Sequence, residues 1–371
     1  MKLVFDLAIS GNNARNSEGS FIRLKDGSIL FAYSRYCSAS WRDEASCSIA
    51  GIRSLDEGET WSEPEILVKS SDFGVANIMS VSALQQQNGD VGLYFLIKEN
   101  DGHTSFGRAL SADGVHFTPE RCEMQAPLSY YVVNNDRFLR LQDGRIAVPV
   151  AMHAFYGYGK ADGFSSATVL VSDDDGKTFC ITPCRLTIPA LNQSGRGMQE
   201  PGIYQYSDGT VYLWARTTAG FQYECFSRDL FQTFTTPQPS PFSSPASPLE
   251  IAEHEGVLYA VYNPAPSYNG HTRTSASANR TPLVVRKSLD EGRKWSLPTV
   301  IEGDKRRGYC YPALFFTRDG AMLCAYCRGG LPEEEFCLQR MGITKIPLEE
   351  ICPTAETDKP TQCWFVDDKN V

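Results

Sequence analysis

A carboxylate and an arginine lie at the two ends of one predicted hairpin in this sequence. Glu200 begins an apolar run and Arg216 ends the next one, with a turn at Asp208-Gly209 between them. Antiparallel strands joined by a short turn bring their outer ends side by side, so the two side chains should meet. Such a pair can handle an acidic ligand, because a guanidinium binds carboxylates with two parallel hydrogen bonds. An ordinary ion pair at a strand end is the alternative interpretation.

Two other segments carry polar or phenolic side chains just before a predicted hairpin. Asn134-Asn135-Asp136-Arg137 precedes the turn at Asp143-Gly144, and Gly308-Tyr309-Cys310-Tyr311 precedes the turn at Asp319-Gly320. A tyrosine is a weak nucleophile with its ordinary pKa near about 10, but a neighbouring carboxylate can accept its proton as it attacks. If all three segments open equivalent strands, their side chains point into one pocket.

The elements that would position these residues are repeated hairpins. An apolar strand, a turn that tolerates positive φ, and a second apolar strand recur six times. The turns are Asp26-Gly27, Asn88-Gly89, Asp143-Gly144, Asp208-Gly209, Glu255-Gly256 and Asp319-Gly320. Recurrence at roughly regular intervals predicts an architecture built from one repeated unit.

A second repeated signal follows most of the hairpins, with the pattern S-x-D-x-G-x-T-W. We call these segments aspartate turns; such repeats are known as Asp boxes. They are Ser54–Trp61, Ser172–Phe179 and Ser288–Trp295, with a shortened copy at Ser111–Phe117 and a copy without glycine at Ser227–Phe234. The aspartate is expected to bond the turn backbone and the aromatic ring to enter the core, so their role is structural.

Each unit thus has four antiparallel strands, and six units predict an all-β, six-bladed β-propeller. We expect one domain over residues 1–371, with a strand near Leu3–Ala8 completing the last blade and a short turn near Pro347–Ile351. The segment Pro237–Pro248 is expected to connect two blades. The predicted blades span 17–66, 77–122, 130–185, 199–238, 246–301 and 308–348.

The composition of the chain excludes some classes of binding partner. The chain has 371 residues, 42% of them hydrophobic, and a net charge of −9, which argues against nucleic acid or an anionic membrane surface as its partner. No segment resembles a membrane span or a signal peptide, so a cytoplasmic location is expected. The 12 cysteines are scattered and the five histidines lack ligand spacing. Reduced thiols, no metal and no cofactor are therefore expected.

Six hairpins with five aspartate turns resemble the sialidase (neuraminidase) superfamily over nearly the whole chain. That resemblance implies a site at the mouth of the central channel, with three arginines for a carboxylate, a Tyr/Glu nucleophile pair and an Asp acid/base. It implies Glu200 as the partner of the tyrosine, and Asp43, in Trp41-Arg42-Asp43-Glu44, as the acid/base, with Glu44 as the fallback. Counting from Asp319-Gly320 gives Tyr311 as the nucleophile, whereas the preceding glycine favours Tyr309.

The resemblance also implies substrate contacts. Arg216 matches one arginine and Arg280 another, with Arg273 as a competitor. The place of the remaining arginine falls on Ser17; Arg15 and Arg35 lie nearby, and Glu18 puts a negative charge beside it. Sugar-hydroxyl contacts are expected from Asn135 and Arg137, with Asp136 between them. The rim candidates are Gln222, Glu224, His153 and His271.

Three functions fit these residues. The first is a retaining exo-glycosidase that removes a sialic acid or another acidic sugar from a glycan. The second is an enzyme of the same fold with another specificity, such as another glycosidase or a uronate lyase; the departure at Ser17 and Glu18 favours it. The third is a carbohydrate-binding propeller without catalysis, since a fold does not fix a function.

Overall fold

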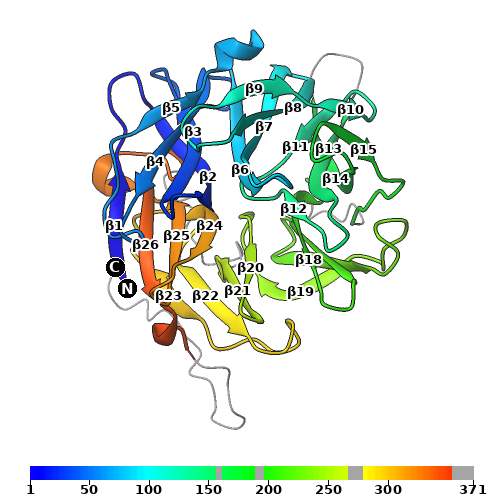
Figure 1. Ribbon diagram of the computed structural model, residues 1–371. Coiled ribbons are helices and arrows are strands. Elements are labelled where there is room, and N and C mark those ends of the chain that lie inside the picture. The colour runs from blue at the N-terminus through cyan, green and yellow to red at the C-terminus, as the bar shows by residue number, and fades with distance from the viewer. Residues whose placement is uncertain (156–160, 189–195, 266–278, 353–371) are drawn as a thin grey trace.

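The computed structural model describes residues 1–155, 161–188, 196–265 and 279–352. Its strands form six sheets arranged like propeller blades around a central axis (Figure 1). The predicted all-β, six-bladed propeller is therefore confirmed. Helical structure in the described ranges is limited to the short 3-10 turns η1 (Ser70–Phe73), η2 (Leu331–Glu333) and η3 (Leu348–Glu350). No helix in those ranges is long and apolar enough to cross a membrane.

Four blades are plain antiparallel sheets whose strands follow one another outward from the axis. The first two contain β2 (Arg15–Arg23), β3 (Ile29–Tyr36), β4 (Cys47–Ser54) and β5 (Glu65–Val68), then β6 (Ile78–Gln85), β7 (Val91–Asn100), β8 (His103–Ser111) and β9 (Thr118–Arg121). The fourth and fifth contain β16 (Gln199–Gln205), β17 (Val211–Arg216), β18 (Phe221–Ser227) and β19 (Gln238–Ser243), then β20 (Glu250–His254), β21 (Val257–Tyr262), β22 (Leu283–Ser288) and β23 (Thr299–Glu302).

The third blade is irregular at both edges. Its inner strand is split into two pieces that both pair with the next strand, and an extra strand runs parallel to its outer edge. The strands are β10 (Glu123–Gln125), β11 (Tyr130–Val132), β12 (Leu139–Arg140), β13 (Ile146–Phe155), β14 (Ala161–Ser172) and β15 (Thr178–Ile181). The break between β11 and β12 contains the polar run Asn134-Asn135-Asp136-Arg137.

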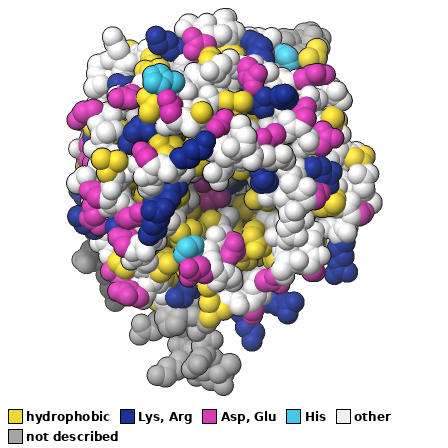
Figure 2. Space-filling view, in the orientation of Figure 1, with side chains coloured by type: hydrophobic (Ala, Val, Ile, Leu, Met, Phe, Trp, Pro, Cys, Tyr) yellow, Lys and Arg dark blue, Asp and Glu magenta, His cyan; other side chains and the backbone are white. Residues whose placement is uncertain are grey.

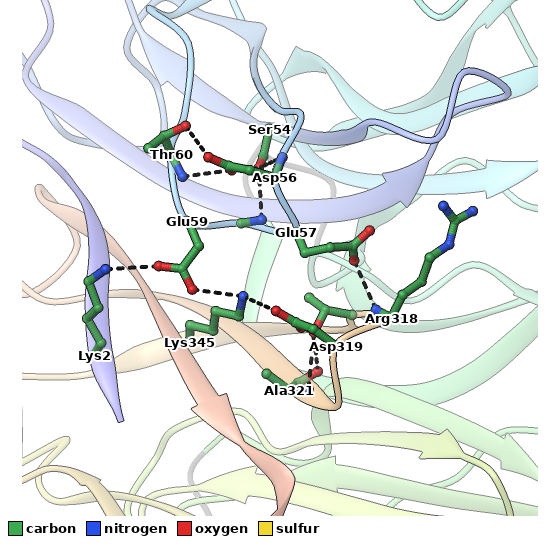
Figure 3. A network of polar contacts seen from close by, with 12 residues as sticks. Lys2, Ser54, Asp56, Glu57, Glu59, Thr60, Arg318, Asp319, Ala321 and Lys345 are labelled. Atoms are coloured by element: carbon green, nitrogen blue, oxygen red, sulfur yellow. Dashed lines mark hydrogen bonds and ion pairs between the residues drawn. The ribbon is translucent and has the colours of Figure 1, made fainter.

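The sixth blade closes the ring with strands from both parts of the chain. It contains β24 (Cys310–Phe316), β25 (Ala321–Cys327) and β26 (Met341–Pro347), with β1 (Lys2–Leu7) antiparallel to β26 as predicted. A polar network ties this blade to the aspartate turn of the first (Figure 3): Lys345 Nζ contacts Glu59 (2.9 Å) and Asp319 (2.6 Å), and Lys2 Nζ reaches Glu59 (2.9 Å). A ring that closes by non-covalent contacts between its first and last strands leaves few exposed sheet edges.

The repeated turns have the predicted local geometry. Every glycine of the six hairpin turns has a positive φ, between 78° and 90°. In the aspartate turns the carboxylate accepts hydrogen bonds from backbone N–H groups, for example from Thr60 to Asp56 (2.9 Å) and from Thr178 to Asp174 (2.8 Å). Strand direction alternates along each blade, so hairpin and aspartate turns share one end of the propeller, which we call the turn end.

The outer strand of the fourth blade differs from the prediction. The segment Pro237–Pro248 was predicted as a connection, yet β19 lies within it and pairs with β18. Pro239 and Pro241 are tolerated there because β19 is an edge strand, where a missing N–H need not break a ladder. The blade therefore extends to residue 243 rather than 238.

Candidate active site

The inner strands share a backbone distortion near the end of the propeller opposite the turn end, which we call the pocket end. In β2, β6, β16 and β24 two residues face a single residue of the neighbouring strand, as in a β-bulge. The first bulge residue is left-handed in each case: Glu18 (φ 56°), Ser80 (59°), Glu200 (44°) and Tyr311 (54°). Left-handed non-glycine residues cost about 1–3 kcal/mol each and concentrate at functional sites.

The bulges of β16 and β24 bring the predicted nucleophile pair together. The Tyr311 hydroxyl donates to Glu200 Oε1 at 3.0 Å, and Arg216 Nη1 donates to Glu200 Oε2 at 2.6 Å. All three side chains are buried. The hairpin argument for Glu200 and Arg216 is thus confirmed, and the carboxylate has one oxygen for the phenol and one for the guanidinium.

Arg280 lies against the same tyrosine. Its guanidinium carbon is 5.4 Å from the centre of the Tyr311 ring, and its Nη1 and Nη2 donate to Cys310 Sγ (3.1 Å) and the Ala246 carbonyl (3.2 Å). Tyr309, the competing tyrosine, is fully buried and packs edge-on against Tyr326 at 6.0 Å. The structure therefore places Tyr311 in the cluster and Tyr309 in the hydrophobic core.

The first blade contributes a buried arginine that links two carboxylates. Arg15 Nη2 donates to Glu18 Oε2 (2.9 Å) and its Nη1 to Asp43 Oδ1 (2.6 Å). Glu18 also accepts bonds from the hydroxyls of Ser17 (3.2 Å) and Ser80 (3.3 Å). Asp43 lies on the loop between β3 and β4, with 61% of its side chain exposed. Arg15 thus occupies the region where the sequence pattern lacks an arginine at Ser17.

Electrostatics separate these groups. Burial is the main cause that raises the pKa of Tyr311 well above its ordinary value; Glu200 adds to the rise, and Arg280 and Arg216 oppose it. Tyr311 is therefore a neutral phenol at neutral pH and needs a proton acceptor to react. Burial also raises the pKa of Glu18 to about 7, although Arg15 favours its charged form. Glu18 consequently changes charge near physiological pH.

The three substrate-binding candidates between β11 and β12 have partners within the protein. Asn135 Nδ2 donates to the carbonyls of Gly19 (2.8 Å) and Pro312 (3.2 Å), across the channel in the first and sixth blades. Asp136 accepts from the Ser20 hydroxyl at 2.5 Å. Arg137 forms a buried ion pair with Glu250. Asn135 and Arg137 are buried and Asp136 is half-buried, so we assign them to the floor that closes the channel rather than to substrate contact.

The other sequence candidates that the structure describes lie outside the cluster. Arg35 and Tyr36 are consecutive in β3, so the Arg35 side chain points to the face opposite Tyr36, which packs against Arg15. Gln222 is fully buried and donates to Ser244 Oγ (3.0 Å) and the Ser247 carbonyl (2.7 Å). Arg273 and His271 fall outside the described residues. His153 is buried at the end of β13, near Tyr130.

A separate cavity of about 440 Å³ lies between the fourth and fifth blades at the turn end, with Tyr206, Glu224 and Trp295 in its wall. None of the clustered residues lines it, so Glu224 belongs to this cavity and not to the rim around Tyr311. The face of the ring in Figure 2 is hollowed near its centre, and acidic and hydrophobic side chains are visible within the hollow. We place the chemistry at Tyr311 because paired acidic, basic and phenolic groups converge there.

Sequence reasoning left the role of Arg15 open. Alternation along a strand puts Arg15 and Ser17 on one face, so the i, i+2 spacing was the available signal. The left-handed backbone at Glu18 had no sequence signal either, because residues other than glycine seldom adopt it. Ser80, which bonds Glu18 from the second blade, had no sequence signal at all.

Comparison with known proteins agrees with this architecture. Residues 88–324 match the family described as BNR repeat-like domain. No curated protein sequence matches the chain.

Solved structures with the same fold include a protein of unknown function from Dyadobacter fermentans, with 16% identity, TM-score 0.70, and 93% of this chain and 99% of that chain covered. The Hadza microbial sialidase Hz136 has 16% identity and a TM-score of 0.70, and the match covers 92% of this chain and 67% of that chain. The intramolecular trans-sialidase from Ruminococcus gnavus, in complex with oseltamivir carboxylate, has 12% identity and a TM-score of 0.68. The match covers 95% of this chain and 98% of that chain. The chain belongs to the BNR repeat-like family and is a sialidase-like six-bladed propeller.

Proposed function

We propose that this chain is a retaining exo-glycosidase that removes a terminal sialic acid or another acidic sugar from a glycan. The observation that carries the proposal is the 3.0 Å hydrogen bond from the Tyr311 hydroxyl to Glu200, with Arg216 and Arg280 beside the same tyrosine. A buried phenol paired with a buried carboxylate is one of the arrangements that activates a weak nucleophile. The two arginines supply positive charge for a substrate carboxylate.

The reaction follows from these contacts. Glu200 accepts the phenolic proton as the Tyr311 oxygen attacks the anomeric carbon, and Asp43 donates a proton to the departing glycosidic oxygen. A glycosyl-tyrosine results. Water then attacks the same carbon from the side of the departed group and gives a proton to Asp43, while the Tyr311 oxygen leaves and recovers its proton from Glu200. Two inversions retain the anomeric configuration.

A tyrosine suits an anionic sugar better than a carboxylate nucleophile does. A neutral phenol does not repel the substrate's carboxylate as it approaches, whereas a second aspartate or glutamate would. Glycosidases with a tyrosine nucleophile are accordingly an exception to the usual pair of catalytic carboxylates.

The test is hydrolysis of fluorogenic α-sialosides and a panel of other acidic and neutral glycosides by the wild type, Tyr311→Phe and Tyr309→Phe. We expect wild-type turnover of an acidic glycoside, a loss of about 10²–10⁴-fold for Tyr311→Phe, and little change for Tyr309→Phe, which is a matched control in the core. Equal losses in the two variants would contradict the assignment. Glycan binding with no turnover by the wild type would make the chain a binding propeller.

A second candidate, an enzyme of the same fold with another specificity such as a uronate lyase, is favoured by Ser17, which stands where the sialidase pattern has an arginine. Such an enzyme would abstract a proton from the sugar and eliminate the glycosidic oxygen, which leaves a double bond in the product. Ultraviolet absorbance of the product, measured in the same panel, distinguishes elimination from hydrolysis.

A further inference from the structure

Arg15 has little hydrogen-bonding capacity left for a ligand. Besides Glu18 and Asp43, its Nη1 donates to the Trp41 carbonyl (3.3 Å) and its Nε to Ser17 Oγ (2.8 Å). Its guanidinium stacks on the Tyr36 ring at 4.5 Å, and the residue is 1% exposed. Each guanidinium nitrogen therefore already has an acceptor.

Arg216 and Arg280 differ in this respect. The Nε of each is buried without a hydrogen-bond partner in the described part of the chain. Arg280 is paired with no carboxylate there; it donates to a thiol and a carbonyl instead. Arg280 therefore keeps an unmatched positive charge and Arg216 is paired with Glu200 alone, whereas the charge of Arg15 is matched by two carboxylates.

Whenever Glu18 is ionised, a substrate carboxylate is disfavoured on the side of the pocket where Arg15 lies. Glu18, Asp43 and Arg15 together carry a net negative charge when both acids are ionised. A carboxylate placed beside Glu18 would meet a like charge in a region where buried groups are weakly screened. The protein's own carboxylate thus occupies the position that an acidic sugar would need.

Asp43 needs an anchor, because it belongs to an exposed loop. Loops of this kind are more mobile than the strands they connect. Two buried side chains hold it: Arg15 binds its carboxylate and the Trp41 carbonyl, and Asn77 Nδ2 donates to the carbonyls of Asp43 (3.1 Å) and Ala45 (2.7 Å). The Trp41 ring also stacks on Phe336 at 4.7 Å.

We propose that Arg15 is a positioning residue, held by Glu18, that fixes the Asp43 carboxylate at the pocket, and that the substrate carboxylate is bound by Arg216 and Arg280 alone. The inference rests on the proposed function for the role of Asp43 as acid/base. It implies an acidic sugar whose charge lies toward the fourth and fifth blades, with uncharged groups toward the first.

Leaving-group dependence separates positioning from binding. Arg15→Ala, Arg15→Lys, Asp43→Asn and Arg280→Lys are compared on an aryl glycoside, whose phenol leaves without a proton, and on an oligosaccharide, whose alcohol requires one. We expect Arg15→Ala to follow Asp43→Asn: kcat on the oligosaccharide falls about 10²–10³-fold, the aryl glycoside is nearly unaffected, and KM hardly changes. Arg15→Lys should keep more of the wild-type kcat than Arg15→Ala does. The double variant Arg15→Ala/Asp43→Asn should have the same kcat on the oligosaccharide as Asp43→Asn alone. A tenfold rise in KM for both substrates in Arg15→Ala, with kcat retained, would overturn the proposal.

A readout without turnover keeps this inference separate from the proposed function. Hydrogen–deuterium exchange over residues 37–46 is measured in the wild type, Arg15→Ala and Arg280→Lys, with thermal unfolding as the check on folding and Glu18→Gln as the milder variant if Arg15→Ala does not fold. We expect at least tenfold faster exchange of this loop in the Arg15 or Glu18 variant and no change in Arg280→Lys. Unchanged exchange in both Arg15→Ala and Glu18→Gln would refute positioning, whether or not the wild type cleaves any glycoside.

Discussion

Carboxylates at the two ends of the propeller have opposite environments. At the turn end, burial alone would raise the pKa of Asp174, but hydrogen bonds from Thr178, Ser172 and Lys177 outweigh it and hold that pKa below its ordinary value. In the channel, burial dominates and raises the pKa of Glu18 to about 7 and of Asp136 to about 6. Carboxylates therefore anchor the backbone at the turn end, whereas in the channel they can change charge near neutral pH.

The comparison shows what decides the role of an acid in this fold. Aspartate turns satisfy their carboxylates with donors a few residues away, so each turn works in isolation. Glu18 and Glu200 instead find their partners on other strands and blades, at Ser80 and Tyr311. Glu18 and Tyr311 lie in the pocket and have a pKa raised mainly by burial, so both are candidates for chemistry.

The largest expected effect comes from removing a pocket carboxylate. Glu200→Gln should lower kcat/KM on an acidic glycoside about 10²–10⁴-fold, because Tyr311 loses its proton acceptor. Asp174→Asn should leave kcat/KM unchanged at a temperature where both variants are folded. Equal losses of activity in the two variants would contradict the distinction between structural carboxylates at the turn end and catalytic carboxylates in the pocket.

A substitution in the channel floor should lower the stability of the protein. Arg137→Met leaves Glu250 buried without its partner, which is expected to cost about 3–5 kcal/mol in the free energy of unfolding. Urea unfolding followed by tryptophan fluorescence measures the loss. Restoring stability with Glu250→Gln in the Arg137→Met background supports a structural ion pair, whereas full stability of the single variant contradicts it.

The pH dependence of stability sharpens the comparison. Because the folded-state pKa of Glu18 is raised from 4.5 to about 7, its favourable contribution is present below about pH 4.5 and is lost as the pH rises through 7. Relative to the wild type, Glu18→Gln should gain up to about 3 kcal/mol between pH 4.5 and 8. Chemical unfolding at several pH values tests this; a difference that does not vary with pH contradicts it.

The smallest effect concerns a single aspartate turn. Asp174→Asn removes the charged acceptor from backbone bonds to Thr178 (2.8 Å) and Lys177 (3.1 Å) and should cost about 1–2 kcal/mol. Asp173→Asn, one residue earlier and exposed, is the control and should change stability by less than about 0.5 kcal/mol. Equal values for the two would mean that the turn bonds contribute nothing net.

The difference between local turns and contacts between blades also explains which features could be predicted from the sequence. The hairpin and aspartate turns are local, so glycine positions and S-x-D patterns predicted the blades and the ring closure by β1. Tyr311 and Glu200 were identified from the resemblance to sialidases, which implies these residue types at the start of inner strands, at a fixed distance from a hairpin. The pairing of Arg137 with Glu250 could not, because it joins different blades, and neither could the left-handed backbone at Glu18, which follows from ring packing and not from the residue type.

The most direct test of the central claim is to trap the covalent intermediate. A fluorinated acidic glycosyl fluoride, which reacts quickly and turns over slowly, is incubated with the wild type and with Glu200→Gln, and the digested protein is mapped by mass spectrometry. We expect one added sugar on the peptide that contains Tyr311, formed by the wild type and much more slowly by Glu200→Gln. Hydrolysis that proceeds with a label on another residue, or with no label at all, would contradict it.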